Sequence, residues 1–154
     1  MFRTLAVLSF LATPAFAHDF RSGDLGVIHP IILKAFHSAR TAAGYMTVAN
    51  DGKQPDMLIG VRIDGVNATV HESRNDDGIS KMVHLDAVEI PAGDAVMFEQ
   101  GGLHVMMMGL APGQFKPGDM VDAVLIFDRQ GEVPISFMVE KHGVKAGHEG
   151  HLAN

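Results

Sequence analysis

The chain has 154 residues, of which 47% are hydrophobic, 19% charged and 6% aromatic. This length fits one domain with short tails, and the apolar content is enough for a core, which argues against a fully disordered chain. Eighteen acidic and twelve basic residues give a formal charge of −6, so no nucleic-acid partner is expected, because phosphate binding needs a basic face. Cysteine is absent, which excludes disulfides, thiolate zinc sites, iron–sulfur clusters and the cysteine ligand of blue-copper sites.

Residues 1–17 have the pattern of a secretory signal peptide. Arg3 gives a positive start, residues 5–11 form an apolar run, and Ala15-Phe16-Ala17 is a small-x-small cleavage signal. We therefore expect a mature protein that begins at His18 and lies in the periplasm; an N-terminal helix of a cytoplasmic protein is the less favoured alternative. No stretch approaches the roughly 20 apolar residues of a membrane helix, so no membrane insertion is expected.

The rest of the chain is dominated by short segments with alternating or β-branched residues, closed by turn signals. Eight of them are predicted as strands, at residues 44–50, 57–63, 66–72, 79–84, 95–100, 103–110, 120–128 and 133–140. Gln130-Gly131 is predicted as a hairpin turn, and residues 31–43, which follow His29-Pro30, as an extended lead-in. The pattern favours an all-β antiparallel sandwich or barrel. We expect a single domain over residues 18–140 and a flexible tail over residues 141–154.

Nine histidines and ten methionines are the unusual feature of the composition. In the predicted strand 103–110, alternate residues point to one face, so His104, Met106 and Met108 share that face. His71 lies near the end of the strand 66–72, and Met82 lies in the strand after the polar loop 73–78. A hairpin there could bring His71 and Met82 together. His71, Met82, His104 and Met106 are therefore the candidate metal ligands.

Two imidazoles and two thioethers form a selective set of donors. Thioether sulfur is a soft, uncharged ligand that suits Cu(I), whereas Zn²⁺, Mg²⁺ and Ca²⁺ prefer charged or harder donors. The competing interpretation is packing, because methionine commonly fills irregular cores and a lone strand histidine is more often part of a hydrogen-bonded structure. Composition and alternation alone leave both interpretations open.

The spacing of these four residues is more specific than their composition. It follows the pattern H-x10-M-x21-H-x-M, within a chain that also contains GYMTVAN at residues 44–50, IPAG at 90–93 and GGLHVMMMGL at 101–110. In these features the chain resembles the periplasmic CuA copper-chaperone family, PCu(A)C or DUF461, over roughly residues 23–140.

The resemblance implies a cupredoxin-like Greek-key β-barrel that binds one Cu(I) at an exposed site formed by the four candidate ligands. It also implies delivery of copper to cytochrome c oxidase, either to the CuA centre of subunit II or to related oxidase sites, often with a Sco-type copper protein as partner. One residue departs from the family pattern: many members have a methionine where this chain has Ser73. Met108 is also present in the family signature, and we expect it to pack rather than bind copper.

The two ends of the chain suggest a second copper site. Cleavage after Ala17 would leave a free amino group beside the His18 imidazole, and nitrogen ligands of this kind suit Cu(II). The tail adds His142, His148 and His151, and some members of the resembled family have His- and Met-rich extensions implicated in Cu(II) binding. The alternative is a solvated end without function. His29, His37 and His84 have no partner that the sequence can assign, and we expect each to be structural or merely exposed.

Two functions remain open for a copper-binding protein of this kind: a chaperone with a dedicated acceptor, and a copper-buffering or resistance protein without one. A copper enzyme would need an open coordination position and accessible Cu(II)/Cu(I) cycling, and a ligand set with two thioethers disfavours it. No serine stands in a nucleophile motif either. We expect a monomeric carrier that is not an enzyme.

Overall fold

The computed structural model describes residues 19–34 and 38–141, which form eleven β-strands and contain no helix. The strands are β1 (Phe20–Ser22), β2 (Leu25–Lys34), β3 (Thr41–Asn50), β4 (Asp56–Arg62), β5 (Asn67–Asp76), β6 (Ile79–His84), β7 (Val88–Ile90), β8 (Asp94–Phe98), β9 (Leu103–Met108), β10 (Met120–Phe127) and β11 (Gly131–Lys141). All eight predicted strands are present, which confirms the all-β prediction.

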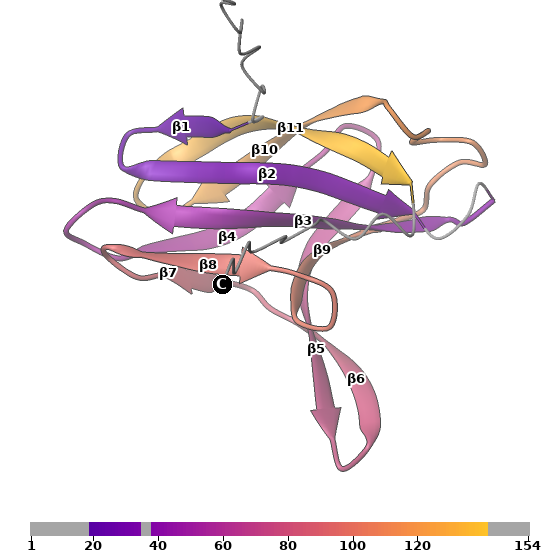
Figure 1. Ribbon diagram of the computed structural model, residues 1–154, viewed down its shortest axis with the longest axis horizontal. Coiled ribbons are helices and arrows are strands. Elements are labelled where there is room, and N and C mark those ends of the chain that lie inside the picture. Colours follow the sequence, from indigo (N-terminus) through magenta and orange to yellow (C-terminus); the bar gives the residue numbers. More distant parts are fainter. Residues whose placement is uncertain (1–18, 35–37, 142–154) are drawn as a thin grey trace, which may run out of the picture.

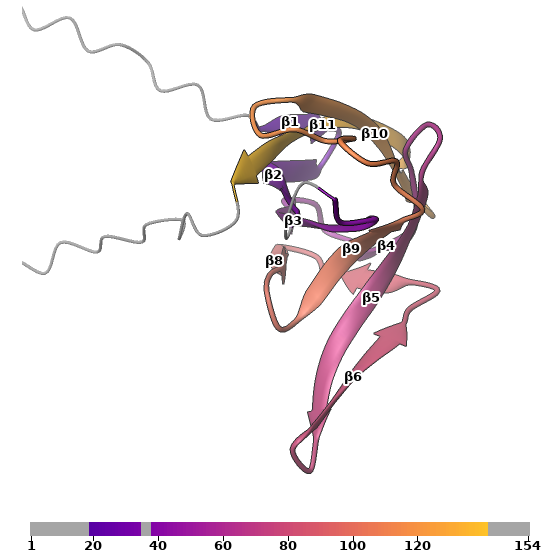
Figure 2. The same ribbon diagram turned by 90° about the vertical axis from the view of Figure 1, so that its right-hand side faces the viewer.

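The strands form one curled sheet in the order β6-β5-β9-β8-β3-β2-β11-β10-β4-β7, with β1 paired to β2 and a further pairing between β9 and β3. Pairing is antiparallel except between β2 and β11 and between β8 and β9. The sheet curls around a common interior, as the two views show (Figures 1 and 2). The hairpin of β5 and β6 projects beyond this body, so its outer end is free of the core (Figure 2).

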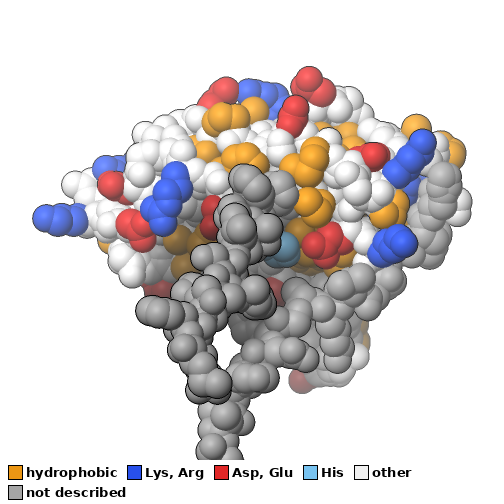
Figure 3. Space-filling model, turned by 45° about the horizontal axis from the view of Figure 1, so that its top comes forward, with side chains coloured by type: hydrophobic (Ala, Val, Ile, Leu, Met, Phe, Trp, Pro, Cys, Tyr) orange, Lys and Arg blue, Asp and Glu red, His pale blue; other side chains and the backbone are white. Residues whose placement is uncertain are grey.

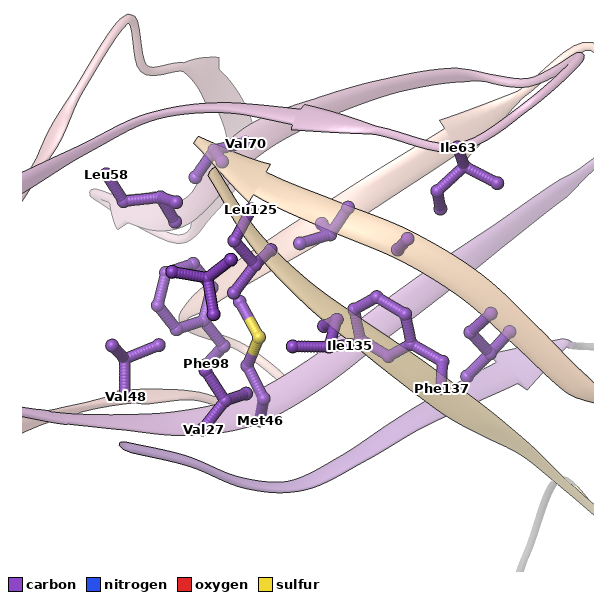
Figure 4. Close-up of a cluster of buried hydrophobic side chains, with 14 of the residues drawn as sticks. Val27, Met46, Val48, Leu58, Ile63, Val70, Phe98, Leu125, Ile135 and Phe137 are labelled. Atoms are coloured by element: carbon purple, nitrogen blue, oxygen red, sulfur yellow. The ribbon is translucent and has the colours of Figure 1, made fainter. Parts of the chain in front are cut away.

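The core follows from the two-residue period of the strands. In β11, Val133, Ile135, Phe137 and Val139 are all buried, and the residues between them are more exposed. The same alternation in β10 buries Ala123, Leu125 and Phe127. These side chains meet others from β2, β3 and β8 in the cluster drawn in Figure 4. A shift of one residue would turn the buried set of a strand to solvent, so the hydrophobic pattern fixes the register.

Three strands were not predicted: β1, β2 and β7. The prediction of residues 31–43 as a lead-in is wrong for residues 31–34, which belong to β2, and for residues 41–43, which begin β3. His29-Pro30 does not interrupt β2, because the pairing register with β3 shifts between Ile28 and Ile31, and His29 adopts a positive φ of 50°. Proline, which lacks an N–H group, is tolerated at such a bulge.

The predicted polar loop over residues 73–78 is also wrong. β5 continues to Asp76 and β6 begins at Ile79, so the connection is a two-residue turn at Asp77 and Gly78. Both turn residues have positive φ angles, 52° and 82°, as a type I′ hairpin turn requires. The longer β5 places His71 in the middle of a strand rather than near its end.

A buried carboxylate stabilises the sheet near β4, at the end of the strand order away from β5 and β6. Asp56, at the start of β4, accepts hydrogen bonds from the backbone N–H groups of Met57, Arg129 and Gln130 at 2.8–2.9 Å. Arg129 and Gln130 belong to the turn that joins β10 to β11, which confirms the hairpin predicted at this position.

The predicted domain limits, with a domain over residues 18–140 and a tail from residue 141, stay a prediction. β11 ends at Lys141, which pairs with Lys34 of β2, and residues 1–18 and 142–154 lie outside the described part of the chain. Among the described residues no helix is long and apolar enough to cross a membrane. On the face shown in Figure 3, acidic and basic side chains are interspersed among hydrophobic ones.

Candidate metal centre

The two predicted histidine ligands lie side by side on neighbouring strands. His71 of β5 is the register partner of His104 of β9, and their ring centres are 6.1 Å apart with an interplanar angle of 28°. Their sequence neighbours Val70 and Val105, which are also register partners, are buried in the core. Because successive side chains of a strand alternate between the two faces, the core valines hold both imidazoles on the outer face.

His104 has a defined hydrogen-bonding state. Its residue surface is only 4% exposed, and its Nδ1 lies 3.1 Å from the carbonyl oxygen of Gly102. A carbonyl oxygen can only accept, so Nδ1 carries the proton and donates it, and in the neutral ring Nε2 bears the lone pair. This Nε2 is buried and has no hydrogen-bond partner. Fixing one ring nitrogen by a backbone carbonyl is how metal-ligating histidines are commonly oriented.

His71 has a similar arrangement with the two nitrogens exchanged. Its Nε2 lies 3.0 Å from Oγ1 of Thr69, while its Nδ1 is buried without a partner. Burial, followed by the charges that His84 and His104 carry when protonated, lowers the pKa of His71 below its ordinary value. A lowered pKa keeps the imidazole neutral, and only the neutral form can bind a metal through the free nitrogen.

These two nitrogens are an energetic anomaly for a packing role. A buried polar atom without a partner costs about 1–3 kcal/mol, and most buried polar side-chain atoms in folded proteins are satisfied. Here two such atoms belong to adjacent rings. A metal cation bound by both lone pairs would remove the cost at both positions, whereas a purely structural role for His71 and His104 leaves it unexplained.

Met106 is placed to supply a third donor. It follows His104 by two residues on β9 and therefore shares its face, about 6.6 Å further along the strand. It is half-buried, and its register partner on β5 is Thr69, the residue that holds His71. Its two neighbours in the chain, Val105 and Met107, are fully buried in the core, which fixes the outward direction of Met106.

Met82 is on the same face but is not gathered with the other three. Its register partner on β5 is Ser73, two residues beyond His71, and it is 61% exposed on the edge strand β6. The hairpin therefore places Met82 two register positions from His71, offset towards the free end of the hairpin. Met82 and Met106 lie on opposite sides of the His71–His104 pair.

His84 is a neighbour of the site that the sequence analysis missed. It is the register partner of His71 on β6, and the two ring centres are 5.3 Å apart in an edge-to-face arrangement. Its Nε2 lies 3.3 Å from Oδ1 of Asp86. Reading Asp77-Gly78 as a two-residue turn would have revealed this pairing, because the turn alone sets the register of the hairpin.

The remaining histidines do not join this centre. His29 is exposed, with Nε2 3.7 Å from Oε1 of Glu140. His18, His37, His142, His148 and His151 lie outside the described residues, so the terminal Cu(II) site stays a prediction. Within residues 19–34 and 38–141, no three His, Cys, Asp or Glu side chains are placed to hold one metal ion together.

Fold and site together define a class: an all-β, cupredoxin-like domain with imidazole and thioether side chains gathered on the outer face of its sheet. The sequence profile of the LpqE-like lipoprotein family matches residues 26–139. The chain therefore belongs to this family, which is the PCuAC or DUF461 family. Both the predicted family and the predicted fold class are confirmed.

Solved structures of PCuAC domains agree with this assignment. The copper-bound PCuAC domain from PmoF2 is 26% identical in sequence, with a TM-score of 0.68, and the match covers 80% of this chain and 98% of that domain. The Cu(I) form of DR1885 from Deinococcus radiodurans is 25% identical, with a TM-score of 0.59, and covers 83% of this chain and 84% of its own. No curated protein sequence matches the chain.

Proposed function

We propose that this protein is a periplasmic copper chaperone that binds one Cu(I) through His71, His104, Met106 and Met82. The observation that carries the proposal is the pair of buried, unpartnered nitrogens, His71 Nδ1 and His104 Nε2, on adjacent rings. Membership of the family and similarity to copper-bound PCuAC domains support copper as the ion.

The chemistry of the donors favours Cu(I) over other ions. All four ligands are uncharged, and two are thioethers, which suit Cu(I) and suit the harder divalent ions poorly. With no cysteine in the chain, the site does not depend on a thiol that could be lost to disulfide formation in an oxidising compartment.

The difference in burial among the donors gives an order of release. His104 is buried and oriented by the Gly102 carbonyl, so it forms the fixed end of the site. Met82 is exposed on an edge strand, and its flexible side chain must swing along the hairpin to reach an ion held by His71 and His104. An incoming acceptor ligand can therefore displace Met82 first while the imidazoles still hold the ion.

The acceptor we propose is a copper centre of cytochrome c oxidase, either CuA in subunit II or a related oxidase site, reached directly or with a Sco-type copper protein. The alternative is a copper-buffering or resistance protein without a dedicated acceptor. Transfer separates them: a chaperone passes Cu(I) to apo subunit II faster than Cu(I) dissociates into solution, whereas a buffer releases copper at its dissociation rate whatever protein is present.

The first experiment is Cu(I) binding to the mature protein, beginning at His18, in competition with a chromophoric Cu(I) chelator. A variant with alanine at all four ligand positions is measured beside it. One tight equivalent in the native protein that is lost in the variant supports the proposal. Equal weak binding in both proteins would refute the site, provided that circular dichroism shows both to be folded.

The termini remain the candidates for Cu(II). We propose that His18 with the free amino group, or His142, His148 and His151, bind Cu(II) more weakly than the main site binds Cu(I). Electron paramagnetic resonance of Cu(II) added to the mature protein and to a variant that ends at Lys141 would test the contribution of the tail.

A further inference from the structure

We propose that His84 is a third imidazole ligand for copper. Together with Met82 and His71 it forms an outer copper position on the edge strand. Through this position the ion enters and leaves the inner, four-ligand position, which His104 and Met106 complete. This inference rests on the proposed function, and it adds a residue outside the four-ligand pattern.

The geometry around His71 is nearly symmetrical. His71 lies on the central strand β5, with His104 of β9 as its register partner on one side and His84 of β6 as its register partner on the other. Each flanking strand also carries a methionine two residues from its histidine, and both methionines lie on the face of the imidazoles. Both β6 and β9 run antiparallel to β5, but Met82 precedes its histidine in the chain and Met106 follows its own. The two methionines therefore lie on opposite sides of the three histidines along the strand direction, Met82 beside Ser73 and Met106 beside Thr69. His71 is thus the shared centre of two His-and-Met half-sites.

The distances between the ring centres allow one copper ion to bind both imidazoles of either pair, His71 with His84 or His71 with His104. A metal–nitrogen bond of about 2.0 Å places the ring centre about 3 Å from the ion, so two ligating rings lie at most about 6 Å apart. The His71–His84 centres are 5.3 Å apart and the His71–His104 centres 6.1 Å apart, so both pairs lie at or within this span.

His84 also has a free nitrogen for the ion. Its Nε2 is held by the carboxylate of Asp86 at 3.3 Å, so in the neutral ring Nε2 carries the proton and Nδ1 bears the lone pair. A carboxylate on the outer nitrogen of a ligating histidine is a recurring arrangement that orients the ring and raises its basicity.

The two positions exclude each other, so they serve one ion and not two. His71 has a single unbonded nitrogen, Nδ1, because Nε2 is held by Thr69. Transfer outwards therefore breaks the bonds from copper to His104 and Met106 as a bond to His84 forms, while the bonds to His71 and Met82 persist. The oxidation state of Cu(I) does not change, and the ligands are neutral throughout.

Exposure gives the exchange its direction. His104 is almost fully buried, whereas the side chain of His84 is 51% exposed and Met82 is 61% exposed. β6 is the terminal strand of the sheet and projects from the body on its hairpin (Figure 2). An acceptor can reach copper at this outer position without opening the core.

Transfer kinetics test the proposal without disturbing the fold, because His84 is a surface residue. Cu(I)-loaded native protein, H84Q and the matched control H29Q are each mixed with a chromophoric Cu(I) chelator, and both equilibrium affinity and transfer rate are measured. We expect the affinity of all three to agree closely, and the transfer rate of H84Q alone to fall several-fold. Equal transfer rates in all three proteins would overturn the proposal.

A second set of variants isolates the outer position. In H104Q/M106L the inner donors are removed with little change in side-chain volume, and we expect weaker but measurable Cu(I) binding. Adding H84Q should abolish this binding, whereas adding H29Q should leave it unchanged. Binding that is insensitive to H84Q, or already absent from a folded H104Q/M106L protein, counts against the outer position. Absence of tight binding in the native protein would instead refute the proposed function itself.

Discussion

His71 of β5 and His104 of β9 are register partners, and each has one buried ring nitrogen without a hydrogen-bond partner. In both residues the second nitrogen is engaged, by Thr69 Oγ1 in one and by the Gly102 carbonyl in the other. Both rings are thus oriented in advance, and a bound cation would relieve the energetic cost of the two unpartnered nitrogens.

Met106→Leu should weaken Cu(I) binding while leaving the fold intact. The substitution removes the thioether sulfur but keeps an apolar side chain of similar volume, so the free energy of unfolding should change by less than about 1.5 kcal/mol. Loss of a direct ligand should cost at least the roughly 10–100-fold in affinity that loss of an outer hydrogen-bond partner costs a metal site. Chelator competition gives the affinity, and urea unfolding gives the stability.

Met108→Leu is the matched control for this experiment. Met108 is also half-buried on the outer face of β9, but its partner on β5 is Asn67, further from His71. We expect its affinity for Cu(I) to match that of the native protein. Equal losses in the two variants would remove Met106 from the ligand set.

Thr69→Val should weaken copper binding although Thr69 is not itself a ligand. Valine has nearly the shape of threonine but cannot hold Nε2 of His71, so the ring loses the contact that orients its free Nδ1. Partners of this kind typically contribute 10–100-fold to metal affinity, and we expect a loss of about tenfold. Thr47→Val makes the same change on β3, away from the imidazoles, and should leave the affinity unchanged. If both variants bind Cu(I) like the native protein, the Thr69 contact does not position His71.

Asp56→Ala should destabilise the fold and leave the copper site alone. The substitution leaves three backbone N–H groups without their acceptor, and each unsatisfied donor costs about 1–3 kcal/mol when buried. We expect about 3 kcal/mol less stability to urea, whereas Asp64→Ala, at an exposed position, should change stability by no more than about 0.5 kcal/mol. Cu(I) affinity measured well below the unfolding midpoint should be the same in both variants. A selective loss of affinity in Asp56→Ala would show that the two ends of the sheet are coupled.

Local pattern was sufficient to predict most of the longer strands of this fold, because alternation over six or more residues is visible without knowing the partners. It failed for β7, whose three residues are too few to show a period. It also failed for β2, where His29-Pro30 resembles a break but is accommodated as a bulge against β3. In that strand, pairing with β3 and β11 overrides the local signal.

The sequence supplied candidate ligands for the site but not their arrangement in space. Alternation placed His104 and Met106 on one face, and the family-like spacing added His71 and Met82. The pairing of β5 with β9 joins segments far apart in the chain, so the stacking of His71 on His104 could not be read from either segment. The pairing of His84 with His71 was missed because the turn at Asp77-Gly78 was taken for a longer loop, which left the register of the hairpin undetermined.

The stability of the copper-free protein should depend on pH through His71. Its pKa is lowered in the folded state, first by burial and then by charge on His84 and His104, so the unfolded chain takes up a proton at higher pH than the folded protein does. Stability from this group is therefore fully present above the ordinary histidine pKa of about 6.5. It declines as the pH falls from there towards the lowered pKa, and levels off below it. We expect urea unfolding between about pH 7.5 and 5 to show a smaller decline in His71→Gln than in the native protein, because the variant lacks the titrating group. An identical decline in the two proteins would mean that His71 titrates alike in the folded and unfolded states, and that burial does not keep its imidazole neutral for copper.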